Sequence, residues 1–284
     1  MPANLNFSFA DPREAKNIIL TCAAWVIALA AAVPLLSVLY MLVSTGGARL
    51  GLELFTELPP AGFEMGGGFG NAIVGTLVMV CLASAISIPL GILAAVYLVE
   101  IAPDGRTTQV TRFVAKVLTG FPSILAGVFV YAAVVVAMNS YSALAGGLAL
   151  AVLMLPTMVL TSAEAMAMVP RKIKDAALGM GCTHSQMIIK VVLPTAAPGI
   201  LTGVMLAVAR VSGESAPLLF TALFSNYWFN SLGQPTASLS ILIYNFSSMP
   251  FDNQIELAWT ASLVLVLIVL LFNVLSRLVG RPKV

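Results

Sequence analysis

The chain has 284 residues, of which 60% are hydrophobic and only 9% are charged, and its mean hydropathy is +1.00. Soluble domains carry roughly 25% charged residues, so this composition excludes a soluble globular protein and indicates an integral membrane protein. The formal net charge of +2 separates no further classes, whereas the positions of the charged residues along the chain do.

Long stretches without charged residues mark the predicted membrane spans. An α-helix rises about 1.5 Å per residue, so it needs about 20 residues to cross a hydrocarbon core of about 30 Å. Each span is expected to be helical, because backbone polar groups have no water partners in lipid. A polar break at residues 139–142 divides one charge-free stretch that is too long for a single helix. The predicted spans are residues 18–43, 72–99, 113–138, 144–163, 199–219 and 257–276.

The basic residues set the predicted orientation, because Lys and Arg gather on the cytoplasmic side of a membrane. The first apolar run is longer than the roughly 7–15 residues of a signal peptide's apolar region, so we expect it to be retained. With both termini in the cytoplasm, the fourteen Lys and Arg residues lie inside, except Arg49 outside and Arg210 within a span. The sequence therefore predicts an all-α integral membrane protein with six transmembrane helices and cytoplasmic N and C termini.

Residue types that bind metals or nucleotides are sparse and unpaired. His184 is the one histidine, and Cys22, Cys81 and Cys182 show neither metal-ligand nor disulfide spacing. The glycine-rich stretch 66–76 superficially resembles a phosphate-binding loop, but it lacks the lysine and opens an apolar span instead of following a strand. We therefore expect no cofactor and no metal in this chain, and any ATP and Mg must be bound by another chain.

Small residues and prolines recur within the predicted spans. Small residues four apart let helix backbones approach closely in lipid, and such pairs are Ala28 with Ala32 and Gly199 with Gly203. A proline inside a helix removes a backbone hydrogen bond and kinks the helix, and such prolines are Pro89, Pro122 and Pro156. Kinked, closely packed helices are compatible with a transport pathway and equally with a static bundle.

Arg210 and Glu214 lie deep in the fifth predicted span, one helical turn apart, so we expect them to pair on one face. If the helix enters the membrane near Gly199, Arg210 lies about 16 Å in, near the midplane. An ionised residue there costs on the order of 3 kcal/mol, so the pair is expected to face a substrate pathway. The alternative is an ion pair that only fixes helix packing. Pro217 leaves the carbonyl of Gly213 without its helical partner, which predicts a kink near the pathway.

A polar stretch at about residues 165–195 lies between apolar spans on the predicted cytoplasmic side. It is far longer than a connection between two helices needs, which indicates a docking surface. The stretch resembles the coupling-loop signature of ABC-importer permeases, E-A-A-x-x-x-G, then nine residues, then I-x-L-P. Asp175 takes the place of Glu and Val191 the place of Ile, and the residues in register are Ala176, Ala177, Gly181, Leu193 and Pro194.

A second segment extends the resemblance to one family. Residues 209–222 resemble the pattern A-R-A-x-G-E-T-A-P-L-L-F-T-A of PstA-type phosphate permeases, with Ser215 in place of Thr, and residues 70–77 resemble the same family. The resemblance covers about residue 70 to the C-terminus. It implies the ABC type I importer permease fold, with an N-terminal tail, first transmembrane helix and external loop in residues 1–69. Residues 70–284 would then form a permease core of five transmembrane helices.

The resemblance also implies what the chain does and with which partners. It implies the permease subunit, not itself an enzyme, of an ATP-driven importer that moves inorganic phosphate across a bacterial inner membrane. The implied partners are a homologous PstC-type permease, two copies of a PstB-type ATPase and an external PstS-type phosphate-binding protein. Arg210 would contact the anion as a planar donor, while Glu214 would keep Arg210 charged and oriented.

The same resemblance assigns the polar stretch to coupling with the ATPase. The loop, including Lys174 and Asp175, is expected to form two short helices hinged near Gly181. The apolar residues expected to fill a groove on the ATPase are Ala176, Ala177, Met180, Met187 and Ile188. Three alternatives remain open: a permease for another oxyanion such as sulfate or molybdate, an ion-coupled secondary transporter, and a non-transporting scaffold that recruits a partner through this loop.

Overall fold

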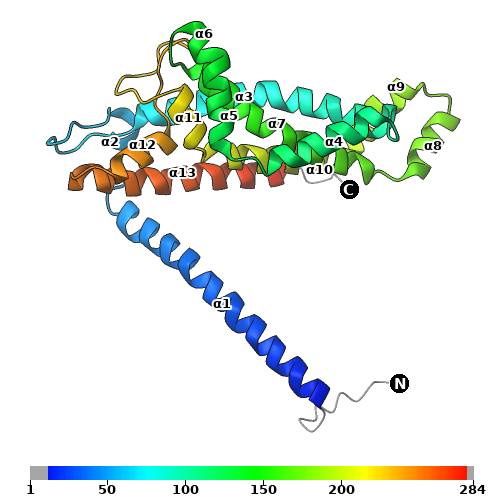
Figure 1. Cartoon of the computed structure of the whole chain (residues 1–284), viewed down its shortest axis with the longest axis horizontal. Helices are drawn as coiled ribbons and strands as arrows, with labels where there is room; N and C mark the ends of the chain where they lie inside the picture. Colours follow the sequence, from blue (N-terminus) through cyan, green and yellow to red (C-terminus); the bar gives the residue numbers. More distant parts are fainter. Residues whose placement is uncertain (1–11, 280–284) are drawn as a thin grey trace.

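The computed structural model describes residues 12–279, and the regular structure in that range consists of helices (Figure 1). Three π-helical segments continue neighbouring α-helices: η1 (Tyr97–Ile101), η2 (Tyr131–Val135) and η3 (Ile188–Val192). The α-helices in chain order are α1 (Pro12–Gly47), α2 (Glu53–Thr56), α3 (Gly70–Val96), α4 (Arg106–Thr119), α5 (Ser123–Val130), α6 (Val136–Met138), α7 (Ala143–Ala167), α8 (Arg171–Gly179), α9 (His184–Met187), α10 (Leu193–Ser212), α11 (Ala216–Thr221), α12 (Leu239–Ser247) and α13 (Asp252–Val279).

The described residues contain five continuous helical stretches that are long and apolar enough to cross a membrane. These stretches are Lys16–Gly47, Gly70–Ile101, Ala143–Ala167, His184–Ser212 and Asp252–Val274. A sixth crossing is available if Arg106–Thr119 and Ser123–Met138 together form one bent span. The prediction of an all-α membrane protein is therefore confirmed, and the number of spans is five or six.

The polar break predicted at residues 139–142 ends one helix and begins the next. Asn139 adopts a left-handed conformation, with a φ of 51°, directly after α6. The hydroxyl of Ser142 then accepts a hydrogen bond from the N–H of Ala145 and caps α7. Both residue types are favoured in these positions, because a short polar side chain tolerates left-handed backbone or satisfies a free N–H at a helix start.

The prediction of one helix over residues 113–138 is wrong. Its segments α4 and α5 meet at an angle of 105°. Gly120 ends α4 and Pro122 immediately precedes α5. A proline disfavours helical backbone at the residue before it, here Phe121, so the helix stops instead of continuing with a kink. Because of this bend, α5 and α6 project to one side of the bundle (Figure 1).

The fifth predicted span, residues 199–219, is displaced along the chain in the structure. The helix runs without interruption from His184 through η3 and α10 and ends at Ser212. Gly213 caps that end, and α11 begins only at Ala216, with Pro217 in its first turn. The expected kink at Gly213 is therefore a break between two helices, because the chain leaves helical hydrogen bonding before the proline is reached.

Close packing of α3, α7 and α10 forms the centre of the bundle. A methyl group built on Gly203 would lie 2.3 Å from Oγ1 of Thr161, and one built on Gly199 would lie 2.8 Å from Cβ of Ala165. Real Cβ atoms do not approach so closely, so these α10 positions require glycine. The prediction that the Gly199–Gly203 spacing marks a close helix contact is confirmed, and the helix in contact is α7.

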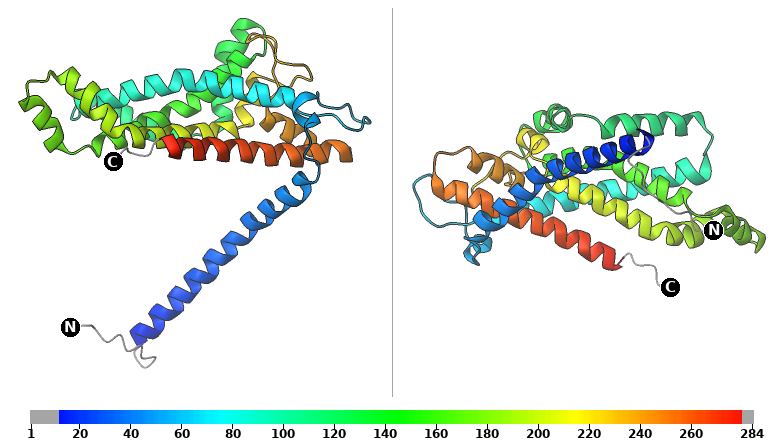
Figure 2. Two further views of the ribbon diagram at one scale, coloured as in Figure 1. Left: turned by 180° about the vertical axis from the view of Figure 1, so that it is seen from behind. Right: turned by 90° about the horizontal axis from the view of Figure 1, so that it is seen from below.

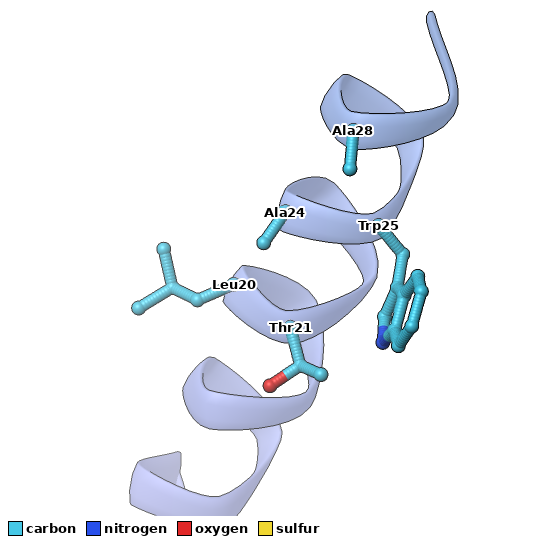
Figure 3. A pocket seen from close by; sticks show the side chains of 5 residues that line it. All are labelled: Leu20, Thr21, Ala24, Trp25 and Ala28. Atoms are coloured by element: carbon cyan, nitrogen blue, oxygen red, sulfur yellow. The ribbon is translucent and has the colours of Figure 1, made fainter. Parts of the chain in front are cut away.

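α1 diverges from the other helices (Figures 1 and 2). It meets α13 near its C-terminal end, where Gly46 lies against the carbonyl of Trp259. Figure 3 shows that Ala24 and Ala28 leave a shallow hollow between larger side chains, and α1 alone forms its walls. Ala28 is exposed, so the Ala28–Ala32 spacing does not mark a contact with another helix of the described chain.

The C-terminal end of α1 meets the bundle at the end away from α8 and α9 (Figure 1), and Arg49, which follows α1, joins three segments of the chain. Its guanidinium donates to the carbonyl of Asn253 at the start of α13 (3.0 Å) and to the carbonyl of Gly66 in the glycine-rich loop (2.7 Å). A weaker ion pair connects Arg49 to Glu256 (3.6 Å). The C-terminal end of α1, the loop and α13 are thereby held together by one side chain.

Candidate functional site

The polar stretch forms two short helices, as predicted, at one end of the bundle (Figures 1 and 2). α8 and α9 are separated by a turn in which Gly181 has a φ of +89°. The side chain of Thr183 accepts from the N–H of Gln186, and the Gln186 side chain accepts from the N–H of Thr183 in return. This capping box satisfies donors that the start of α9 would otherwise leave free. Gly181 is therefore the turn residue between the two helices.

The second helix of the stretch is continuous with the fifth span. α9 passes through η3 into α10 without a break, and Leu193 and Pro194 lie in the first turn of α10. Pro194 directly follows the π turn of η3, in which the N–H of Leu193 donates to the carbonyl of Ile188. Within this continuous stretch, the missing N–H of the proline therefore removes one helical hydrogen bond next to an existing irregularity. α9 and Ser212 thus belong to one continuous helical stretch.

The apolar residues of the stretch divide into an inner and an outer set, and the expectation that all five reach a partner is wrong. Ala177, Met187 and Ile188 are buried against α3, α7 and α10 within this chain. They anchor α8 and α9 to the bundle, so they have no surface left for a partner. The exposed members of the expected set are Ala176 and Met180. Ile173 and Leu178 are also exposed apolar residues of α8.

Lys174 of α8 forms an ion pair with Glu100 of η1, a contact that the sequence analysis did not anticipate. The distance from Nζ to Oε1 is 2.5 Å, and the two side chains are 15% and 5% exposed. Charged side chains of this kind are almost never buried unless they are paired. Glu100 directly follows the charge-free stretch of the second span, which was the one sequence signal available for it.

Arg210 lies in the last turn of α10 and reaches the end of α4. Its Nη2 donates a hydrogen bond to the carbonyl oxygen of Thr119, the last residue of α4 (3.3 Å). The last carbonyls of a helix have no partner within that helix, and they carry partial negative charge, so a cation is favoured there. The Arg210 side chain is otherwise exposed on this chain. The guanidinium therefore has donors left for a further partner.

The expected ion pair between Arg210 and Glu214 is not formed. Ion pairs form elsewhere in the chain, between Arg49 and Glu256 and between Lys174 and Glu100. Glu214 lies beyond the end of α10, so the spacing of four residues does not place it on the same helix face as Arg210. Its backbone is held instead, because its N–H donates to the carbonyl of Val211 (3.2 Å) and its carbonyl accepts from Ser240 of α12 (2.9 Å).

The breaks in two chain segments meet close to Arg210. α5, which follows the 105° bend, packs on α11, which follows the break at Gly213. A methyl group on Gly127 of α5 would lie 2.6 Å from Cα of Pro217, so the two short helices approach as closely as backbones allow. Among the described residues, no group of His, Cys, Asp and Glu side chains is arranged to hold a metal ion. The guanidinium of Arg210 is an exposed hydrogen-bond donor next to the ends of α4 and α10.

Comparison with known proteins places these features in a family. Residues 87–281 match the model of the family described as "binding-protein-dependent transport system inner membrane component". The chain is 39% identical to the phosphate transport system permease protein PstA of Yersinia pestis, over 88% of this chain and 84% of that protein. It is 42% identical to the protein of the same name from Xylella fastidiosa, over 86% of this chain and 85% of that protein.

Solved structures share the fold at lower sequence identity. A chain of a bacterial alginate ABC transporter matches 96% of this chain with a TM-score of 0.66 at 16% identity, and 99% of that chain is covered. A chain of the MetNI methionine ABC transporter matches 74% of this chain with a TM-score of 0.60 at 20% identity, and 92% of that chain is covered. The protein thus belongs to the binding-protein-dependent transport system inner membrane components and, among them, to the PstA-type permeases.

Proposed function

We propose that this chain is the membrane-spanning permease subunit of an ATP-driven importer that carries inorganic phosphate across the inner membrane. The relatives named above are phosphate transport permeases, and the identity to them extends over most of both chains. The single structural observation that carries the proposal is Arg210, a permanently charged donor exposed at the junction of two broken helices. A guanidinium presents several N–H groups in a plane and suits phosphate oxygens.

The length of α4 supports a position for Arg210 inside the membrane. α4 has 14 residues and so is about 21 Å long, whereas the hydrocarbon core is about 30 Å thick. It starts near the end of the bundle that holds α8 and α9, and Arg210 contacts its far end. An ionised side chain at such a depth costs on the order of 3 kcal/mol, which favours a role in a pathway over simple packing.

The proposed topology has six spans, with α4 and α5 together forming the third, and both termini in the cytoplasm. The basic residues Arg106 and Lys190 then lie toward the cytoplasmic side, together with those of α8, in line with the bias of Lys and Arg toward that side. Lys116, in the last turn of α4, lies deeper, close to the level of Arg210. Residues 1–11 of the predicted tail and residues 280–284 at the C-terminus lie outside the described residues. The division into 1–69 and a core of 70–284 stays a prediction, and the matched family region falls within that core.

The partners we propose follow from membership in a binding-protein-dependent family. They are a homologous PstC-type permease, two PstB-type ATPases that bind ATP and Mg, and an external PstS-type protein that delivers phosphate. The exposed face of α8, with Lys172, Asp175, Ala176 and Met180, is the proposed contact with the ATPase. Gly181 sets the angle between α8 and α9 there, and the helix leading through Pro194 carries the motion toward Arg210.

In the proposed pathway Glu214 has a changed role. Because it does not pair with Arg210, it cannot hold that side chain in place as first expected. Gly213 and Pro217 border the break in which Glu214 lies, and its carbonyl is fixed by Ser240. We propose that Glu214 is a second polar residue beside the pathway, whose carboxylate disfavours the approach of anions that Arg210 does not hold.

The decisive experiment is reconstitution of the complex in proteoliposomes with its partner permease, ATPase and binding protein. Uptake of phosphate, sulfate and molybdate is measured with ATP, without ATP, and with an ion gradient alone. We expect phosphate uptake that requires ATP and the binding protein. Preferential uptake of another oxyanion would reassign the substrate, and uptake driven by a gradient without the ATPase would reassign the chain to the secondary transporters.

A further inference from the structure

The largely buried ion pair between Lys174 and Glu100 links two parts of the molecule that lie far apart in the sequence. Lys174 belongs to the short helix α8, and Glu100 belongs to η1 at the end of the second span. The Glu100 side chain is 5% exposed, so its charge is balanced at close range by Lys174 and not by water. α8 is therefore attached to the second span by a direct polar contact.

α8 is joined to the bundle by different means on its different sides. Its chain continues through Val169 into α7 at one end and through the Gly181 turn into α9 at the other. Ala177 inserts a small side chain among residues of the core. With only nine residues, α8 offers few further contacts, and Lys174 supplies its ionic contact with the second span. A movement of α8 thus reaches α10 through the backbone and the second span through this pair.

A buried ion pair is a poor means of merely stabilising such an attachment. Removing two charges from water costs free energy that their attraction only partly returns, and well-packed apolar residues often hold as well or better. What a lysine adds is reach, because its charge sits on a flexible four-carbon stem. The attraction between two charges falls off slowly with distance, whereas a gap of about 0.5–1 Å already forfeits a quarter to a half of the dispersion attraction between packed apolar groups. The pair can therefore stay connected while α8 shifts.

Both segments next to this contact contain π-helical turns. η1 contains Glu100, and the N–H of Ala102 donates to the carbonyl of Tyr97 five residues earlier (3.0 Å). η3 follows α9 on the route to α10. Single π turns inside α-helices are frequent at functional sites, because the helix is locally wound differently there. The second and fifth spans, which α8 contacts, thus each carry a π turn close to α8, namely η1 and η3.

Resting on the proposed function, we infer that the Lys174–Glu100 pair is a positioning contact for transport, which keeps the second span in step with α10 when the ATPase moves α8. The covalent route through α9 moves α10 and Arg210 directly. The ion pair moves α3, which packs along α7 in the centre of the bundle. Without the pair, α8 would still bind the ATPase and still pull α10, but α3 would no longer follow.

The test compares variants in the reconstituted complex and measures two rates, ATP hydrolysis and anion import. The apolar double variant Lys174→Met with Glu100→Leu removes both charges and keeps the volume buried. We expect it to assemble and hydrolyse ATP, with the number of anions imported per ATP lowered about fivefold or more, the lower range of measured couplings between sites. Lys174→Arg keeps the charge and is expected to keep most of the coupling.

A matched control is available at the other end of the molecule. Glu256→Gln breaks the Arg49–Glu256 ion pair, in which the Glu256 side chain is 61% exposed, and it is expected to leave the import per ATP unchanged. Glu100→Gln makes the same chemical change in the Lys174–Glu100 pair and is expected to lower the number of anions imported per ATP. Equal coupling ratios in the apolar double variant and the unaltered complex would show that the pair only fixes structure, and the inference would be wrong.

The ratio is measured with whichever of phosphate, sulfate or molybdate the unaltered complex imports. A different substrate therefore changes the proposed function and leaves this inference standing. An unaltered complex that hydrolyses ATP and imports none of the three contradicts both. Failure of Glu100→Gln to assemble would reflect an unpaired buried lysine, and the apolar double variant, which leaves no charge unpaired, then decides the question.

Discussion

The guanidinium of Arg210 closes the end of α4 by donating to the carbonyl oxygen of Thr119 (3.3 Å). The bond joins the last turns of two helices whose continuations both turn away, α4 at its 105° bend and α10 at Gly213. The C-terminal ends of α4 and α10 therefore lie close together, with the Arg210 guanidinium between them. Backbone that leaves helical hydrogen bonding within a membrane is tolerated where it lines a cavity or is buried in protein, which fits a pathway here.

Arg210→Gln is expected to reduce phosphate uptake by about 10- to 100-fold, since a hydrogen bond to a charged group contributes about 1.5–3 kcal/mol. Assembly is expected to survive, because Arg210 is exposed and holds one hydrogen bond to Thr119 and no ion pair with Glu214. Uptake per assembled complex is the measurement. Arg210→Lys keeps the charge without the planar donors, and its phosphate uptake is expected to lie between that of the unaltered protein and that of Arg210→Gln. Unreduced uptake by Arg210→Gln would remove this residue from the pathway.

The proposed orientation predicts which positions an impermeant thiol reagent can reach. In a background without the three native cysteines, Asn226→Cys lies in the exposed segment after α11 and is expected to react from outside in intact cells. Ser185→Cys lies in exposed α9 and is expected to react only after the membrane is opened. Labelling is measured by mass shift of the purified chain. The reverse pattern would invert the topology.

Gly203→Ala is expected to destabilise the bundle by about 1–3 kcal/mol, the usual cost of forcing an extra group into a packed core. The new methyl group would lie 2.3 Å from Oγ1 and 2.7 Å from Cβ of Thr161 in α7, and rotating the Thr161 side chain cannot move its Cβ away. The measurement is the midpoint of thermal unfolding in detergent. Gly47→Ala is the matched control, because nothing lies within 4 Å of its added group. Equal midpoints for the two variants would contradict the close contact between α7 and α10.

The sequence predicts four of the six membrane spans closely, because crossing lipid depends on long apolar runs, which local composition reveals. The third predicted span is broken, and the fifth is displaced along the chain. The sequence does not reveal how those helices are interrupted. Pro122 and Pro217 were both visible, yet a proline only weakens helical bonding, and surrounding contacts decide between a kink and a break. Here the backbone of Pro217 packs closely against Gly127 of α5. This contact joins the segment after the bend between α4 and α5 to the segment after the break at Gly213.

The partners of charged residues were the least predictable part of the candidate site. A spacing of four places Arg210 and Glu214 together only while one helix continues, and α10 ends between them. Lys174 finds its partner 74 residues away, in a span whose approach to α8 depends on the whole bundle. By contrast, the turn at Gly181 was predicted from the resemblance to the coupling-loop signature, in which this glycine is in register, and the structure has a φ of +89° there.

Gly181→Val tests whether the angle between α8 and α9 matters for coupling. Gly181 has a φ of +89°, a region that β-branched residues avoid, while nothing lies within 4 Å of an added Cβ. The substitution therefore strains the backbone without a steric clash, at a cost of about 1–3 kcal/mol. We expect the turn to relax toward negative φ and to misdirect α8, so that the assembled complex loses ATPase binding or imports fewer anions per ATP.

The matched control for Gly181→Val is Gly66→Val, which has a φ of +83° and equally open surroundings in the loop at the opposite end of the bundle. Both variants carry a similar backbone strain, so a similar loss of thermal stability is expected from each. Only Gly181→Val is expected to impair ATPase binding, measured by co-purification, and the import of anions per ATP. If both variants lower the number of anions imported per ATP equally, general destabilisation explains the effect and the Gly181 turn has no particular role. If neither variant lowers it, coupling does not depend on the angle between α8 and α9.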